Sequence, residues 1–337
     1  AARGYLPIEG LASYNKGAQT LLLGADSPLI AEGRVLTAQA LGGTGALKIG
    51  ADFLRQLLPN SKVVISNPSW ENHRALFERA GFKVETYPYY DATTHGLDFA
   101  SMLAALKTLP AKTIVVLHAC CHNPTGVDPS IEQWRQIAQV VKDADLVPFI
   151  DIAYQGFGDG LEEDAAVVRL FASLGLTMLV SSSFSKSFSL YGERVGALTL
   201  VAGSQDEKDR VLSQLKRVIR TNYSNPPTHG GTIVASVLNS PELYALWVEE
   251  LAEMRNRIRA MRQQLVEKLK ARGVAQDFDF VLAQRGMFSY SGLTAEQVDR
   301  LRNEHSVYAV SSGRICVAAL NSRNIDYVAD AIAQVIA

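Results

Sequence analysis

Residues 181–195 read SSSFSKSFSLYGERV and hold a single lysine, Lys186, among small hydroxyl residues. The apolar run MLV at 178–180 predicts a buried strand that ends at these serines. Lys186 therefore follows a strand end, where burial disfavours the ammonium form and lowers the pKa of the amine. A neutral lysine amine is a nucleophile that forms Schiff bases with carbonyl compounds.

The same segment holds groups that suit a phosphate. Arg194 follows Lys186 by eight positions, and serines surround the lysine. Guanidinium groups bind phosphate through two parallel hydrogen bonds, and serine hydroxyls add short neutral ones. The segment thus favours a cofactor that carries both a carbonyl group and a phosphate, as pyridoxal phosphate does.

Within this segment alone, Lys186 is also compatible with two different roles. A loop lysine is most often a solvated surface charge. Ser183 and Lys186 also form the Ser-x-x-Lys pattern of penicillin-binding proteins, although the SDN and KTG motifs that accompany it are absent. Other segments of the chain are needed to distinguish these roles of Lys186.

Composition excludes several classes of protein. The chain has 337 residues, of which 47% are hydrophobic and 20% charged, so it can form a large core and two domains. Its net charge of -1 does not indicate a basic surface for nucleic acid, and no apolar run is long enough for a membrane span. Three cysteines, two of them adjacent, do not make a disulfide framework. We expect a cytoplasmic protein without a nucleic-acid or membrane partner.

Apolar strands alternate with amphipathic helices through the first two thirds of the chain. Continuous apolar strands between such helices are typical of a parallel sheet covered on both faces. The pattern predicts an α/β fold, a three-layer sandwich around a mostly parallel sheet. The expected strands are 35–38, 62–66, 83–87, 113–118, 147–150, 178–182 and 195–201.

Polar clusters follow four of these strands. Ligands of such sheets bind beyond the carboxyl ends of the strands, so a site is expected there. A glycine turn at 42–45, GGTG, also begins a helix whose N-terminus attracts an anion, but it matches neither the dinucleotide nor the P-loop motif. The four clusters are 67–70, 118–123, 151–154 and 183–186.

A long helix divides the chain. It is expected to begin at Ser240 and Pro241 and to end at Gly273, which gives a length of about 45 Å. We expect residues 1–240 to form a large cofactor-binding domain and residues 241–337 to form the linking helix and a small α/β domain. In the small domain, strands are expected near 280–283, 287–290, 307–310 and 315–318, and helices from Thr294 and Asn324.

Seven motifs follow one another along the chain: GGTGALK, NPSWENH, CCHNPTG, DIAYQGF, SFSKSFSLYGERVG, NYSNPP and SGRICVA. In these motifs the sequence resembles the fold-type I aminotransferases of the aspartate and aromatic amino acid group. The resemblance extends over essentially the whole chain. It implies a homodimer that shares its active sites between subunits, binds pyridoxal phosphate, and moves an amino group from an amino acid to a 2-oxo acid by a ping-pong mechanism.

The resemblance also assigns roles around the cofactor ring. It implies that Lys186 binds pyridoxal phosphate through a Schiff base and then moves a proton. Asp151 would pair with the protonated ring nitrogen, with His118 as its supporting partner. Asn123 and Tyr154 would hydrogen-bond the phenolic oxygen of the ring.

Further residues are implied for the phosphate and the substrate. Trp70 would stack on the ring and, with Asn123, contact the substrate. Arg314 would bind the α-carboxylate, and Arg220 of the partner subunit, with Arg217 as a near neighbour, would bind a distal carboxylate. No metal site is predicted. The phosphate would be held by Gly43, Thr44, Ser183 and Arg194, with Tyr5 reaching it from the partner subunit.

The substrate preference is predicted from three stretches. FSLYGERVG, MFSYSGL and EQVDRLR are more similar to the bacterial aromatic amino acid, or tyrosine, aminotransferases, which accept both aromatic and dicarboxylic substrates. Because an unpaired buried guanidinium is costly, Arg220 is expected to turn toward solvent when the substrate is aromatic.

Alternatives to this function are an aspartate-preferring aminotransferase, a pyridoxal phosphate lyase or decarboxylase on the same fold, and a non-catalytic aminotransferase-like regulator. No DNA-binding module or basic segment supports the last of these. The family also carries an N-terminal arm that packs on the other subunit. This arm is expected before the position of Ala1 and is absent from the chain as given.

Overall fold

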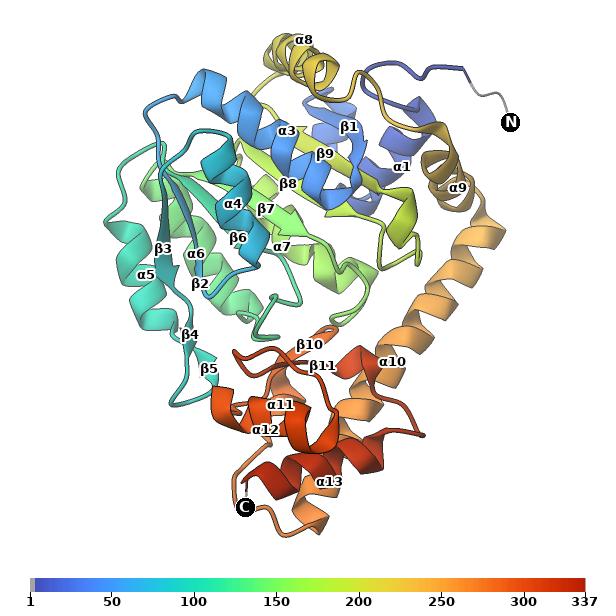
Figure 1. Cartoon of the computed structure of the whole chain (residues 1–337). Helices are drawn as coiled ribbons and strands as arrows, with labels where there is room; N and C mark the ends of the chain where they lie inside the picture. Colours follow the sequence, from blue (N-terminus) through green and yellow to red (C-terminus); the bar gives the residue numbers. More distant parts are fainter. Residues whose placement is uncertain (1–3, 337) are drawn as a thin grey trace.

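The computed structural model describes residues 4–336 and has three layers, a central sheet between two layers of helices (Figure 1). Ala1, before which the additional arm is expected, lies outside the described residues. The sheet order is β1 (Val35–Leu41), β9 (Val195–Val201), β8 (Met178–Ser183), β7 (Val147–Ile152), β6 (Ile114–His118), β2 (Val63–Asn67) and β3 (Val84–Pro88). The strand β9 is antiparallel to β1 and to β8, and the other neighbouring pairs of this sheet are parallel. The predicted sandwich around a mostly parallel sheet is confirmed.

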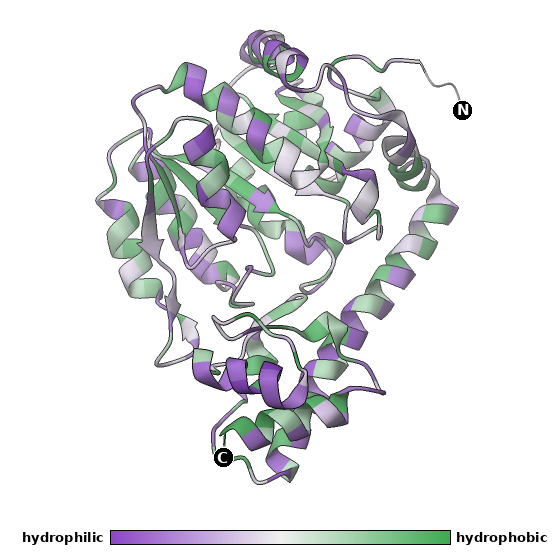
Figure 2. Ribbon diagram, in the orientation of Figure 1, coloured by the Kyte–Doolittle hydropathy of each residue, from purple (hydrophilic) through white to green (hydrophobic). Residues whose placement is uncertain are grey.

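The two faces of the sheet belong to different apolar clusters. Along β6, Ile114 and Val116 join one cluster, and Val115 and Leu117 join the other, because successive side chains of a strand point to opposite faces. Figure 2 shows hydrophobic residues along the strands and hydrophilic ones on the outer helices. One face is covered by α3 (Gly42–Leu57), α4 (Glu71–Arg79) and α8 (Gln205–Asn222), the other by α1 (Ala12–Leu23), α5 (Phe99–Lys107), α6 (Ile131–Asp143) and α7 (Leu161–Ser173).

Local capping groups set where two helices begin. Ser130 and Gln133 form a reciprocal capping box at the start of α6. Thr294 and Gln297 do the same for α12 (Ala295–His305), at the position that the sequence predicts. Each box satisfies backbone amide groups that the first helical turn leaves without partners.

The predicted long helix is α10 (Pro241–Ala271), which has 31 residues. The Ser240 hydroxyl accepts a hydrogen bond from the Leu243 amide and caps its first turn. The helix carries the chain from the side of the sheet to the C-terminal lobe, residues 272–336 (Figure 1). The shorter elements before it are α2 (Pro28–Ala31), β4 (Tyr90–Asp91), β5 (Gly96–Leu97) and α9 (Thr228–Leu238).

The C-terminal lobe differs from the prediction in three places. Residues 280–283 form a short helix, α11 (Phe280–Ala283), and residues 307–310 form no strand. A run of four apolar residues fits a strand or a helical turn equally well, so its periodicity does not distinguish the two structures. The strand expected at 315–318 is present only as β11 (Arg314–Cys316), because the short helix η2 (Val317–Ala319) follows it, and the other expected elements are present as β10 (Phe288–Tyr290) and α13 (Ile325–Ile336).

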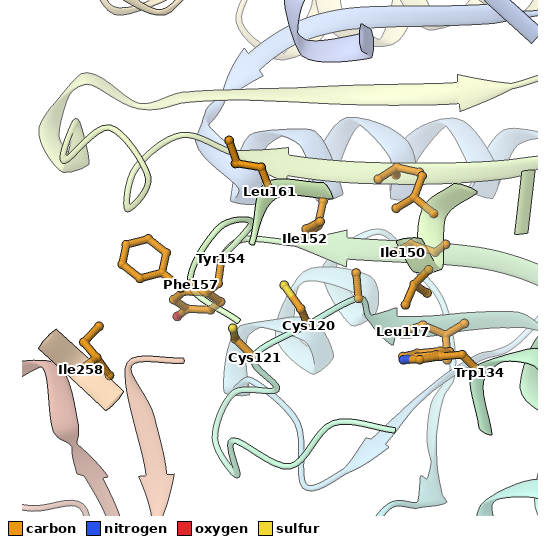
Figure 3. Close-up of a cluster of buried hydrophobic side chains, with 14 of the residues drawn as sticks. Leu117, Cys120, Cys121, Trp134, Ile150, Ile152, Tyr154, Phe157, Leu161 and Ile258 are labelled. Carbon is orange, nitrogen blue, oxygen red and sulfur yellow. The ribbon is translucent and has the colours of Figure 1, made fainter. Parts of the chain in front are cut away.

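The apolar core continues from the sheet to the long helix. Figure 3 shows Tyr154 and Phe157, which follow β7, on the side of Ile258 of α10. These three side chains belong to one buried cluster together with Ile152 of β7. The loop that carries Tyr154 is therefore packed against two rigid elements.

None of the helices within residues 4–336 combines the length and the apolar character that crossing a membrane requires.

Candidate active site

The register of the sheet aligns the ends of three strands. His118 at the end of β6 lies opposite Asp151 of β7, and Asp151 lies opposite Ser181 of β8. The segments that follow these strands open into one cavity of about 190 Å³. Among the residues that line it are Gly43, Thr44, Trp70, His118, Asn123, Asp151, Tyr154, Ser183, Lys186 and Arg194. Ten residues named from the sequence are thus brought together at the predicted edge of the sheet.

Lys186 lies just beyond β8, partly buried in this cavity. Its Nζ is 5.0 Å from the centre of the Tyr154 ring. Burial lowers the pKa of the Lys186 amine, the charge of Asp151 opposes this effect, and Arg194 adds to it. The amine is therefore more readily neutral, and more nucleophilic, than a solvated lysine.

Asp151 is supported by His73 and not by His118. The His73 Nε2 and Asp151 Oδ2 atoms are 2.7 Å apart, and the ring is fully buried. His118 contacts the Ser69 hydroxyl at 3.2 Å, and this hydroxyl also contacts His73 Nδ1 at 2.9 Å. The prediction for His118 was wrong because α4 brings His73 over the strand ends and leaves His118 behind it. The signal was present in the motif NPSWENH, where His73 lies one helical turn after Trp70.

The imidazoles behind Asp151 are held in the neutral form. Burial, followed by the nearby charge of His73, lowers the pKa of His118 to about 3. Burial also lowers the pKa of His122 well below its usual value, and this ring is fixed by the hydroxyl groups of Ser66 at 2.9 Å and Thr125 at 2.7 Å. Neutral rings leave the negative charge of Asp151 available to a cation in the cavity.

Tyr154 and Asn123 also line the cavity. Burial, followed by the charge of Asp151, raises the pKa of Tyr154 well above its usual value, so it acts as a neutral hydroxyl donor. Asn123 Oδ1 accepts a hydrogen bond from Arg314 Nη1 at 3.0 Å. The Arg314 guanidinium also lies 4.7 Å from the centre of the Phe288 ring. These contacts bring Arg314 to the border of the cavity, where its planar donors suit a carboxylate.

The start of α3 and Arg194 form an anion cradle in the same cavity. The N-terminal turn of α3 presents backbone amides at Gly43 and Thr44, and the helix dipole favours negative charge there. Arg194 is held over this turn, because its Nη1 donates to the Tyr191 carbonyl at 2.9 Å and to the Ser185 hydroxyl at 3.3 Å.

Glycine is required for the close approach of these groups. Gly42 has a φ of +70°, and a methyl group at this position would clash with the Arg194 guanidinium. A Cβ on Gly43 would lie 3.2 Å from the Ser183 Cβ. Backbone amides, a guanidinium and serine hydroxyls converge here, and Lys186 and Asp151 line the same cavity. This arrangement fits a cofactor with a phosphate at one end and a carbonyl-bearing, protonated ring at the other.

Two predicted residues lie away from this cavity. The Tyr5 side chain is 95% exposed, and Arg220 is exposed on α8 with its Nη1 2.5 Å from the Ser224 hydroxyl. Neither residue is brought to the cavity of its own chain. The sequence also missed several lining residues, of which Ser185 and Tyr191 belong to the quoted segment 181–195 and the others are Leu47, Cys120 and Ala153.

A model of the family described as aminotransferase class I and II matches residues 1–332. The chain belongs to this family. Its sequence is 66% identical to aspartate aminotransferase from Pseudomonas aeruginosa, over 100% of this chain and 84% of that protein. It is 55% identical to aromatic-amino-acid aminotransferase from Escherichia coli, over 98% of this chain and 83% of that protein.

A solved structure is similar over the whole chain. It is aromatic-amino-acid aminotransferase from Burkholderia pseudomallei covalently bound to pyridoxal phosphate, with 71% identity and a TM-score of 0.99. The match covers 100% of this chain and 84% of that one. The chain therefore has the fold of the fold-type I aminotransferases, in the aspartate and aromatic amino acid branch.

Proposed function

We propose that this protein is a pyridoxal phosphate-dependent aminotransferase that moves the amino group of an aromatic or acidic amino acid to a 2-oxo acid such as 2-oxoglutarate. One observation carries the proposal. Lys186, Asp151 and Arg194, three groups with distinct roles toward this cofactor, line a single cavity. The family match and the relatives named as aminotransferases support it.

The residues of the chain divide the work of the reaction. When bound, pyridoxal phosphate supplies a conjugated ring that takes up the electron pair left at the α-carbon of the substrate. Asp151, fixed by His73, holds a proton on the ring nitrogen. Lys186, whose amine is readily neutral, moves the proton at the α-carbon. Arg314 binds the α-carboxylate and orients the substrate, and Tyr154 donates a hydrogen bond to the ring oxygen.

The proposal is tested by the absorbance of the bound cofactor. We expect a yellow protein whose absorbance changes when an amino donor is added alone and returns when a 2-oxo acid is added. The Lys186→Ala variant should lose nearly all turnover, because it lacks the nucleophile and the proton-transferring amine. Full turnover of this variant, or release of ammonia or carbon dioxide instead of a 2-oxo acid, would contradict the assignment.

The preference for aromatic donors is part of the proposal. It is supported by the stretches FSLYGERVG, MFSYSGL and EQVDRLR and by the relatives named for aromatic amino acids. An aspartate-preferring enzyme is the second candidate, favoured by the 66% identity to the Pseudomonas aeruginosa protein. The ratio of kcat/KM for phenylalanine to that for aspartate separates the two candidates.

We also propose a cytoplasmic homodimer in which Tyr5 and Arg220 serve the partner's site. The exposure of both side chains, away from their own cavity, supports this sharing. The free cysteines of the described chain are compatible with a reducing compartment. Residues 1–240 and 241–337 would be the large and small domains, and an N-terminal arm would pack on the partner subunit.

A further inference from the structure

Arg262 is a buried arginine on α10, only 2% exposed. Its Nη2 donates to the carbonyls of Gly286 and Phe288, both at 2.7 Å. Its Nη1 donates to the Ser289 hydroxyl at 2.8 Å and to the Val281 carbonyl at 3.4 Å. All four acceptors are uncharged. A buried cation held only by neutral groups is a costly arrangement, so its place in the fold calls for a reason beyond charge pairing.

Three of the four acceptors lie in β10 or two residues before it. β10 pairs with β11 in an antiparallel register that sets Tyr290 opposite Arg314 and Phe288 opposite Cys316. The Phe288 ring lies under the Arg314 guanidinium, with 4.7 Å between the Cζ atom and the ring centre. The position of β10 therefore determines both the backbone of Arg314 and the surface on which its guanidinium rests.

The other side of β10 contacts the turn that carries Asn123. The Tyr290 amide donates to the Thr125 carbonyl at 3.3 Å. A Cβ on Gly126 would lie 2.8 Å from the Phe288 carbonyl, so only glycine allows the strand to come this close. The Phe288 carbonyl thus accepts a hydrogen bond from Arg262 and lies close to Gly126 of the turn.

Asn123 connects this turn to Arg314. Its Oδ1 accepts from Arg314 Nη1, and it lies two residues before Thr125 in the same turn. Arg314 is consequently fixed from below by Phe288, from the side by Asn123, and through its strand by β10. Arg262 is the group of α10 that locks β10 into this arrangement.

We propose that Arg262 is a positioning residue for Arg314, which sets the site for the substrate's α-carboxylate through β10 without touching the substrate. This inference rests on the aminotransferase function proposed above. A purely structural role would lower the stability of the lobe and leave substrate affinity unchanged. A positioning role changes the affinity for carboxylate-bearing substrates.

The experiment compares Arg262→Met and Arg262→Lys with Arg272→Met in the full-length protein loaded with pyridoxal phosphate. Methionine keeps the length of the side chain and removes the donors, and lysine keeps the charge with fewer directed donors. Arg272 is a matched control, because it lies just after the same helix and ties it to Asp326 and Asp330 of α13, away from β10.

For Arg262→Met we expect KM for the amino donor to rise about tenfold, about 1.4 kcal/mol, with kcat changed less than threefold, because binding common to the ground and transition states is lost. Arg262→Lys should recover part of this loss. Arg272→Met should leave KM unchanged. Cofactor affinity, measured by titrating each apoprotein with pyridoxal phosphate, should change less than KM, since the phosphate cradle is formed by α3 and the loop that carries Arg194 and not by β10.

Hydrogen exchange gives a readout that does not depend on turnover. Peptides that cover 286–290 and 314–316 should exchange faster in Arg262→Met than in the wild type, and not in Arg272→Met. Unchanged KM with a fall in Tm alone, or an equal rise of KM in Arg272→Met, would overturn the proposal. If the wild type itself shows no transamination, the proposed function fails instead, and the exchange data still report whether Arg262 holds β10.

Discussion

At the scale of single residues, the site depends on a carboxylate that buried imidazoles surround and orient. His73 contacts Asp151 directly, whereas His118 and His122 lie behind it with lowered pKa values. The two histidines nearest Asp151 therefore have different roles, although both are buried. One supports the functional carboxylate, and the other contacts the Ser69 hydroxyl and lines the cavity without charge.

Removing the side chain of His73 should reduce activity more than removing that of His118. His73→Ala deletes a hydrogen bond to a charged group, worth about 1.5–3 kcal/mol, so kcat should fall by about 10- to 100-fold. His118→Ala should lower kcat by less than about threefold, since it leaves that bond intact. Steady-state kinetics with a saturating donor measures both. Equal losses in the two variants would contradict the assignment of His73.

The lowered pKa of His118 should make the free energy of unfolding depend on pH. Its pKa is about 3 in the folded protein and near its ordinary value of 6.5 in the unfolded chain. As pH falls below about 6.5, the unfolded chain takes up a proton that the folded site does not. The free energy of unfolding should therefore decrease by up to about 1.4 kcal/mol per pH unit from this group.

The His118→Asn variant should show a shallower loss of stability in this window, because asparagine does not titrate. Urea unfolding at pH 5, 6 and 7 measures the slope for both proteins. An identical slope in the variant would show that other groups account for the acid sensitivity.

At the scale of elements, the phosphate site that we propose for the cofactor is formed by the start of α3 and the loop that carries Arg194. The Arg194 guanidinium can lie close to the backbone of α3 because Gly42 lacks a side chain and adopts a positive φ. Neither element would form the cradle alone. The helix supplies the amides, and the loop after β8 supplies the guanidinium.

Gly42→Ala should weaken pyridoxal phosphate binding by about 10- to 100-fold, as expected when charge-assisted hydrogen bonds worth about 1.5–3 kcal/mol are displaced. Gly175→Ala is a matched control, because Gly175 has a φ of +73° and nothing lies within 4 Å of the position of its Cβ. Both variants carry backbone strain, and only the first displaces Arg194. Titration of the apoproteins with the cofactor gives the dissociation constants, and similar values for both variants would refute the role of this contact.

At the scale of the whole molecule, the cavity of one chain lacks two of the side chains that the resemblance assigns to it. Tyr5 and Arg220 project from the surface, so a second chain has to supply them if they act as proposed. This makes the oligomeric state part of the active site. It also allows the sharing to be tested with two inactive variants.

Mixing Lys186→Ala and Arg220→Ala chains under conditions that exchange subunits should restore activity toward aspartate. Each mixed dimer would contain one site with an intact Lys186 and an intact Arg220 from the other chain. The single variants, refolded alone, serve as controls and should remain poorly active with aspartate. If mixing restores nothing although mixed dimers form, Arg220 acts within its own chain or not at all.

The sequence by itself determined the architecture of the sheet and most of the cavity. Strand periodicity is local, and the polar clusters follow strands whose carboxyl ends meet at one edge, so Lys186, Asp151 and Arg194 could be assigned to one site from the sequence. The motifs then identified the family.

Only the tertiary structure decided which groups support these residues. Whether His73 or His118 reaches Asp151 depends on where α4 packs against the sheet. The motif NPSWENH contains His73, but it does not contain the packing that brings this ring to Asp151. The helix at 280–283 and the bonds of Arg262 to β10, 24 to 27 residues further along the chain, were equally hidden. Contacts between distant segments depend on how side chains pack in the folded protein, and a local pattern of residues carries no information on that packing.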